Sequence, residues 1–243
     1  MRRRLSLRAN GTLRNFSIAL TVLPPSLDSV CGDLRSRPRR DRRQGFYTGS
    51  VYCDKELRIR FKGECIKDNR ILGIKTHDWG NPTKRDVYKK AVFVLRSPYE
   101  AVLAWYKFMR GHGHKSNVEE SNFHSEDWFK FIQTESYYWV VLNYDWLKRF
   151  NGPMHVIMYD QLKSNASLEI TKLAEFLERP LTNHDINCIM KNSEGEFHRP
   201  HTNQVAAIDR YSETDQIYID KYIENITNVL TSRFPYSNFR IPK

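Results

Sequence analysis

The apolar residues of this chain follow two patterns, short unbroken runs and longer stretches with a helical period. Three runs, ILGI at 71–74, AVFVL at 91–95 and HVIMY at 155–159, are apolar on both faces, which is typical of buried parallel strands. Around them, apolar positions recur every three to four residues, as amphipathic helices require. The sequence therefore predicts an α/β domain with a mostly parallel sheet flanked by helices.

The helices are expected from this spacing and from the residues that begin them. Pro98, directly after Ser97, favours a helix start that continues through EAVLAWYKFM. A long helix is predicted over residues 125–149, and Ser167 is the expected cap of a shorter one. Ser212 precedes a last amphipathic stretch, TDQIYIDKYIENITNVL.

The net charge of +11 is concentrated at one end of the chain. Residues 1–43 hold eleven arginines against three aspartates, whereas the other 200 residues hold 28 basic and 25 acidic side chains. A body so close to neutral lacks the domain-wide basic footprint of a nucleic-acid-binding protein. We expect a disordered arginine-rich tail over 1–43 and a folded domain over 44–243. A nuclear-localisation or polyanion-binding arm is the functional alternative for the tail.

Cysteine spacing and hydropathy argue against two further classes of protein. The four cysteines form no C-x-x-C pair, which disfavours a zinc site. A disulfide between Cys53 and Cys65 is an alternative that the spacing alone does not decide. The apolar stretch FSIALTVL at 16–23 is far shorter than the roughly 20 residues that span a bilayer, and it lacks the pattern of a signal peptide. We expect no metal, no membrane span and no visible anchor.

Polar residues follow each of the three predicted strands: KTH at 75–77, RSP at 96–98 and YD at 159–160. Open parallel sheets bind ligands beyond the carboxyl ends of their strands, so these residues should meet at one edge. Taken singly, each has a structural explanation, such as a surface histidine or an ion-paired arginine. The joint arrangement favours a functional site.

This set of side chains suits transfer of a charged group from an anionic nucleotide to a hydroxyl. Histidine titrates near neutral pH, so His77 is the expected base that removes the hydroxyl proton. Lys75 would stabilise the negative charge that gathers on the leaving phosphate. Arg96, at a strand tip before a helix N-terminus, is placed to clamp a phosphate.

The segment ILGIKTHDWG…AVFVLRSPYEAVLAWYKF resembles the nucleotide-dependent sulfotransferases, whose donor is 3′-phosphoadenosine-5′-phosphosulfate (PAPS). In that family one strand ends in Lys-Thr-His and a later one in Arg-Asn-Pro, which is RSP in this chain. The resemblance implies that His77 and Lys75 are catalytic and that Arg96 and Ser97 bind the donor without a metal. It also implies an α/β fold similar to that of P-loop NTPases.

Later segments extend the resemblance along the chain. MYDQLKSNASLEITKLAEFL is similar to the next family block, which implies that Tyr159 contacts the adenosine. Lys191 falls at the lysine of the family's C-terminal loop over the 3′-phosphate, and Arg199 is a further donor. The short motifs TGS-x-Y, FKGE, IKTH and RSPYEA resemble those of the WSC-domain-containing branch. That branch is similar to Golgi enzymes that sulfate glycans, with sialic acid among the suggested acceptors.

Departures from the family pattern leave three interpretations open. Ala104 and Met190 replace a serine and an arginine of the family. Residues 1–43 match no glycine-rich loop for the 5′-phosphosulfate. The expected fold is therefore incomplete at its N-terminus. The chain is an active sulfotransferase acting on a glycan hydroxyl in the Golgi lumen, or a truncated or inactive homologue that keeps only the 3′-phosphate half of the site. The third interpretation is a polyanion-binding protein that acts through its basic tail.

Overall fold

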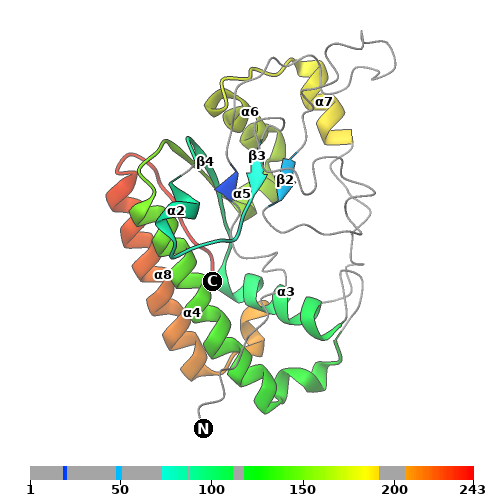
Figure 1. The fold of residues 1–243 in the computed structure, drawn as a ribbon. Helices are drawn as coiled ribbons and strands as arrows, with labels where there is room; N and C mark the ends of the chain where they lie inside the picture. The colour runs from blue at the N-terminus through cyan, green and yellow to red at the C-terminus, as the bar shows by residue number, and fades with distance from the viewer. Residues whose placement is uncertain (1–18, 21–47, 51–72, 87, 112–117, 192–205) are drawn as a thin grey trace.

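The computed structural model describes residues 19–20, 48–50, 73–86, 88–111, 118–191 and 206–243 (Figure 1). One sheet has the strand order β1-β4-β5, and a second pairs β2 with β3. Strands β2 and β3 are parallel, as are β4 and β5, whereas β1 runs antiparallel to β4. The mostly parallel sheet predicted from the apolar runs is therefore confirmed. The strands are β1 (Ala19–Leu20), β2 (Thr48–Ser50), β3 (Gly73–Lys75), β4 (Ala91–Leu95) and β5 (Met154–Met158).

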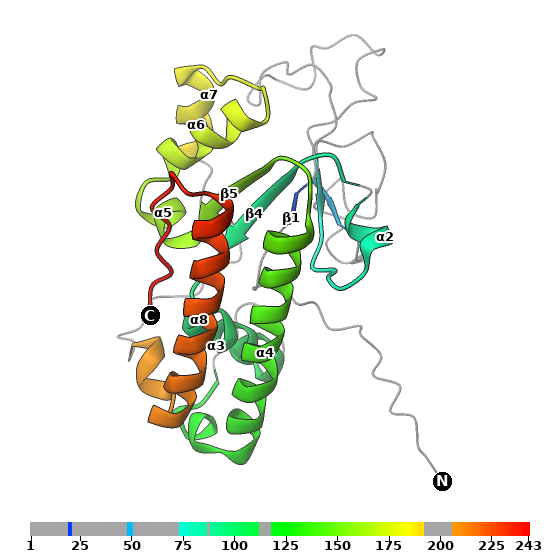
Figure 2. The same cartoon turned by 90° about the vertical axis from the view of Figure 1, so that its left-hand side faces the viewer.

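Helices cover both faces of the sheet that contains β4 and β5 (Figures 1 and 2). Side chains alternate along β4: Phe93 and its neighbours two positions away pack into the main core, whereas Val92 packs with Ile157 and Leu177 on the other face. Burial on both faces explains why these strands read as continuous apolar runs. The helices are α2 (Pro82–Arg85), α3 (Pro98–Arg110), α4 (Glu126–Arg149), α5 (Tyr159–Ser164), α6 (Ala166–Phe176), α7 (Asn183–Lys191) and α8 (Glu213–Arg233), with 3-10 turns η2 (Glu120–His124) and η3 (Ala207–Arg210).

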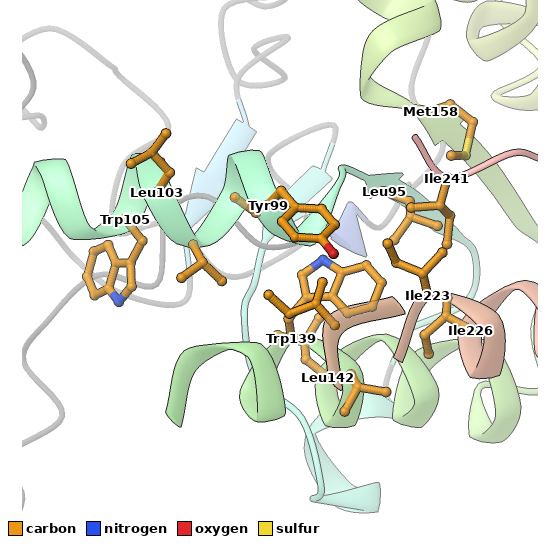
Figure 3. Close-up of a cluster of buried hydrophobic side chains, with 14 of the residues drawn as sticks. Leu95, Tyr99, Leu103, Trp105, Trp139, Leu142, Met158, Ile223, Ile226 and Ile241 are labelled. Carbon is orange, nitrogen blue, oxygen red and sulfur yellow. The ribbon is translucent and has the colours of Figure 1, made fainter. Parts of the chain in front are cut away.

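The two longest helices, α4 and α8, lie side by side against the main core (Figure 2). The predicted helix over 125–149 is confirmed as α4, which begins after Ser125, whose hydroxyl oxygen accepts from the Trp128 backbone N–H at 3.2 Å. Large buried side chains from α3, α4 and α8 fill the space between them and the sheet (Figure 3). This core supplies the rigid support on which the strand ends are held.

The predicted cap of α6 is wrong by two residues. Asn165, not Ser167, caps the helix: its side-chain oxygen accepts from the Leu168 backbone N–H at 3.3 Å. Asn165 also ends α5, and its non-helical backbone, with a φ of −144° and a ψ of 63°, marks the break between the two helices. Ser167 lies inside the first turn of α6, where its carbonyl accepts from Thr171.

Two residues of the segment predicted as a disordered tail form a strand. Ala19 pairs with Phe93 and Leu20 with Val92, and β1 also contacts β3. Both residues belong to the apolar stretch at 16–23, and they pair with β4 on the edge opposite β5. The remainder of 1–43 lies outside the described residues, and a domain boundary at 44 stays a prediction.

Candidate functional site

The backbone after β3 carries His77 into the interior, where its side chain is only 3% exposed. Thr76 precedes it, and the Thr76 hydroxyl accepts a hydrogen bond from the Asp78 backbone N–H at 3.0 Å. The carbonyl of Asp78 in turn accepts from the indole N–H of Trp146 on α4, at 2.9 Å. These two bonds hold the backbone of Asp78, directly after His77, to Thr76 and to α4.

The turn after His77 is also attached to α4. The backbone N–H of Gly80 donates to a carboxylate oxygen of Asp145 at 3.0 Å, and Gly80 has a φ of +73°, which favours glycine. Trp79 packs against Tyr138 of the same helix, with ring centroids 6.0 Å apart. Several contacts from one helix thus hold the segment that positions the histidine.

Arg96 and Tyr159 meet beyond the ends of two paired strands. Leu95 and Met158 are the last register partners of β4 and β5, so the residues that follow them lie side by side. The guanidinium carbon of Arg96 lies 4.5 Å from the centre of the Tyr159 ring, a cation–π distance. The expected convergence is met for these two strand ends, whereas β3, which leads to His77, pairs with β2 in the second sheet.

The N-terminus of α3 opens next to Arg96. Ser97 is the N-cap residue and is 1% exposed, but its side chain makes no capping bond, and its Oγ has no hydrogen-bond partner among the described residues. The first backbone N–H groups of a helix point outward without intrahelical partners and carry partial positive charge. A buried hydroxyl, a helix N-terminus and a guanidinium together form a site suited to a phosphate.

Two acidic side chains, Glu100 and Asp160, lie near Arg96, and Glu100 was not among the residues expected in the site. One of its carboxylate oxygens accepts from Arg96 Nε at 3.0 Å and lies 2.9 Å from Arg96 Nη2. Burial raises the pKa of Asp160 above its ordinary value, and the Glu100 charge raises it further, whereas Lys163 and Arg96 lower it. The spacing of Glu100, four residues after Arg96, is the sequence signal that could have identified it.

A single face of α4 joins the two halves of the site. Trp139 donates its indole N–H to the Arg96 carbonyl at 3.1 Å, as Trp146 does to Asp78. Seven residues separate the two tryptophans, which is about 10 Å along a helix axis. The helical spacing of both tryptophans indicates only core positions, yet their indole N–H groups attach the backbone of both segments to α4. Figure 3 shows Trp139 in this core with Tyr99.

The remaining predicted site residues are less well placed. Lys75 is the last residue of β3, paired in register with Ser50, and its side chain lies outside what the structure describes. Lys191 is exposed at the end of α7, a helix that packs on α6. Arg199 and the proposed Cys53–Cys65 pair lie outside the described residues. Their roles stay predictions.

The described part of the chain contains neither a candidate metal cluster nor a candidate membrane span. Within it, no three or more His, Cys, Asp or Glu side chains come together as a possible metal site. None of the helices seen there combines the length and apolar character needed to cross a bilayer.

Glu135, one turn before Trp139 on α4, is the group whose titration bears most clearly on stability. Burial raises the pKa of Glu135 from 4.5 to about 7, against a hydrogen bond with Trp105 that lowers it. Its buried Oε2 has no hydrogen-bond partner in the described part of the chain. A raised folded-state pKa means that the folded protein holds the proton more tightly, so this contribution to stability is full below pH 4.5 and is lost as pH rises to about 7.

We expect Glu135→Gln, which keeps the neutral shape, to be more stable than the wild type at pH 8 and nearly equal at pH 4.5. The measurement is the melting temperature of both proteins across this range. Glu126→Gln, which neutralises an exposed carboxylate on the same helix, should leave the pH profile unchanged. Parallel profiles for Glu135→Gln and the wild type would contradict the assignment.

Comparison with known proteins identifies the family. A family model described as "Sulfotransferase domain" matches residues 74–224. The chain is 29% identical over 181 residues to a WSCD family member of Aedes aegypti, covering 73% of this chain and 56% of that protein. It is 27% identical over 174 residues to one of Drosophila melanogaster, covering 70% and 54%. The chain thus spans about half the length of these relatives.

Two further similarities are more distant. Over 127 residues the chain is 30% identical to Sulfotransferase 6B1 of Danio rerio, covering 51% of this chain and 42% of that protein. A structure of mouse sulfotransferase SULT7A1 complexed with PAP matches 56% of this chain and 57% of its own, with 13% identity and a TM-score of 0.42.

Proposed function

Because this chain belongs to the sulfotransferase family, in its WSCD branch, we propose that it transfers a sulfuryl group from PAPS to a hydroxyl. The observation that carries the proposal is the Arg96–Tyr159 contact at the open N-terminus of α3. A guanidinium and helix N–H groups suit the 3′-phosphate of the nucleotide, and an aromatic face beside them suits its adenosine.

In the proposed reaction, His77 accepts the proton of the acceptor hydroxyl as the hydroxyl oxygen bonds to the sulfur of the donor. The bond from sulfur to the donor's 5′-phosphate oxygen breaks at the same time, and its electron pair leaves with adenosine 3′,5′-bisphosphate (PAP). Lys75 stabilises the charge that builds on that oxygen. Arg96 and Ser97 hold the 3′-phosphate throughout, with Lys191 and Arg199 as further cationic groups.

We propose a glycan hydroxyl as the acceptor, with sialic acid as one candidate, and the Golgi lumen as the location. The similarity of the chain's motifs to the WSC-domain-containing branch supports both. The described site adds one compatible feature: Trp79 and the partly exposed Tyr138 lie next to the His77 turn and offer aromatic surface for a sugar ring.

Incubation with PAPS carrying labelled sulfate and a panel of glycans tests the proposal. Label transferred to a glycan supports it, and a panel with and without sialic acid identifies the acceptor class. PAP binding without transfer would favour the inactive homologue that keeps only the 3′-phosphate half of the site. Absence of both PAP binding and transfer would refute the proposal.

Arg96→Ala should weaken PAP binding by about 10- to 100-fold, since charge-assisted hydrogen bonds to phosphate are lost. Arg96→Lys should recover only part of the affinity, because an ammonium cannot reproduce the planar contact with Tyr159. Isothermal titration calorimetry measures both. Arg240→Ala, which removes an exposed arginine near the C-terminus, should bind PAP as the wild type does. Equal affinities for Arg96→Ala and Arg240→Ala would remove Arg96 from the site.

A further inference from the structure

Two helices of this protein begin with the same sequence pattern but different hydrogen bonds. At α8, Ser212 and Asp215 form a complete capping box, in which each side chain bonds the backbone N–H of the other residue. At α3, Ser97 and Glu100 occupy the equivalent N-cap and N3 positions, S-x-x-E. There the Ser97 side chain makes no capping bond, so that half of the box is open.

The Arg96 side chain explains what Glu100 does instead. One Glu100 carboxylate oxygen contacts both Nε and Nη2 of Arg96, at 3.0 and 2.9 Å. The guanidinium carbon of the same side chain lies over the Tyr159 ring, 4.5 Å from its centre. Glu100 thus fixes the orientation of Arg96 while the hydroxyl of Ser97, buried and without a partner among the described residues, stays available at the helix start.

We infer that Glu100 is a positioning residue that holds Arg96 ready for the nucleotide 3′-phosphate and also limits the affinity for it. The inference rests on the proposed function. A phosphate that takes the Nε and Nη2 donors must displace the Glu100 carboxylate from them, and any phosphate bound at Arg96 lies close to that negative charge.

The surrounding charges strengthen the second effect. Asp160, at the start of α5, has its Oδ2 buried without a partner among the described residues. Burial raises the Asp160 pKa, and the Glu100 charge raises it further, so the two carboxylates are close enough to interact unfavourably. The positive charges of Lys163 and Arg96 act in the opposite direction and lower the Asp160 pKa. Removing one negative charge here should therefore favour a phosphate, most strongly at low salt, because exposed charges are screened by ions.

Glu100→Gln is the decisive variant, because its amide oxygen still accepts from Arg96 but its charge is gone. We expect PAP to bind about tenfold more tightly to it than to the wild type, as measured by calorimetry at low salt. Adenosine 5′-phosphate, which lacks the 3′-phosphate, should show no such gain. Glu213→Gln removes an exposed first-turn carboxylate of α8 and should leave both affinities unchanged.

Glu100→Ala separates the positioning role from the charge effect. Without an acceptor for Arg96, this variant should gain less PAP affinity than Glu100→Gln. If the wild type binds PAP but Glu100→Gln binds it no more tightly, the inference is wrong and the proposed function stands. If the wild type does not bind PAP at all, the proposed function itself fails. An equal gain for PAP and adenosine 5′-phosphate would also overturn the inference, because Glu100 would then not act at the 3′-phosphate.

Discussion

Replacing His77 with alanine should lower the rate of sulfuryl transfer by about 10²- to 10⁴-fold, the usual contribution of a general base. The reason is its place in the structure: the side chain is buried on a turn fixed to α4 and follows the strand that ends in Lys75. A base held in this way needs no reorientation as the hydroxyl loses its proton. PAP affinity should stay within about twofold of the wild type, because the proposed 3′-phosphate contacts involve other residues.

Single-turnover transfer of labelled sulfate, measured beside PAP binding, tests this expectation. The binding measurement separates loss of chemistry from loss of folding, which matters for a residue only 3% exposed. His184→Ala, at an exposed position of α7, is the matched control and should keep wild-type turnover. Turnover in His77→Ala equal to that of His184→Ala would eliminate His77 as the base.

The convergence of Arg96 and Tyr159 could be predicted from sequence because strand ends follow a simple rule. Two apolar runs that pair in parallel register bring the next residue of each chain segment to the same edge. The last paired residues are Leu95 and Met158, so the runs at 91–95 and 155–159 placed these two strand ends to within one residue. The long helix α4 was equally readable, since its apolar positions keep a helical period over more than six turns.

The contacts that set distances within the site could not be read in this way. Trp139 and Trp146 serve as core residues by pattern, and their second role, donation to the carbonyls of Arg96 and Asp78, depends on which backbone groups lie above the helix. The S-x-x-E pattern at Ser97 likewise predicts a closed capping box. The Arg96–Glu100 contact itself is local, at i and i+4, but the cation–π contact of the same guanidinium with Tyr159 comes from another element and does not follow from that spacing.

The buried ion pair between Asp145 and Arg85 supports the same turn that carries His77. Asp145 is 3% exposed, and its carboxylate accepts from Arg85 Nη1 at 3.0 Å and from the backbone of Gly80 at 3.0 Å. Arg85 is 6% exposed, and its Nε also lies 2.9 Å from a carboxylate oxygen of the exposed Asp86. Asp145 therefore connects α2, the His77 turn and α4 through a single side chain.

Asp145→Ala should destabilise the protein by about 3 to 5 kcal/mol, because it leaves the Arg85 charge buried without its main partner. We expect the lower end of this range, since Asp86 remains in place. Urea unfolding followed by tryptophan fluorescence measures the change. Glu126→Ala breaks an exposed pair with Lys130 and should shift stability by less than about 1 kcal/mol.

The double variant Arg85→Met with Asp145→Leu distinguishes a buried charge from a general loss of packing. Removing both charges together should restore much of the stability that Asp145→Ala loses, because no unpaired ion is then left inside. It should not restore transfer activity, since the Gly80 backbone N–H still lacks its acceptor and the His77 turn is no longer fixed to α4 through it. If Asp145→Ala proved no more disruptive than Glu126→Ala, the ion pair would not be what holds this turn in place.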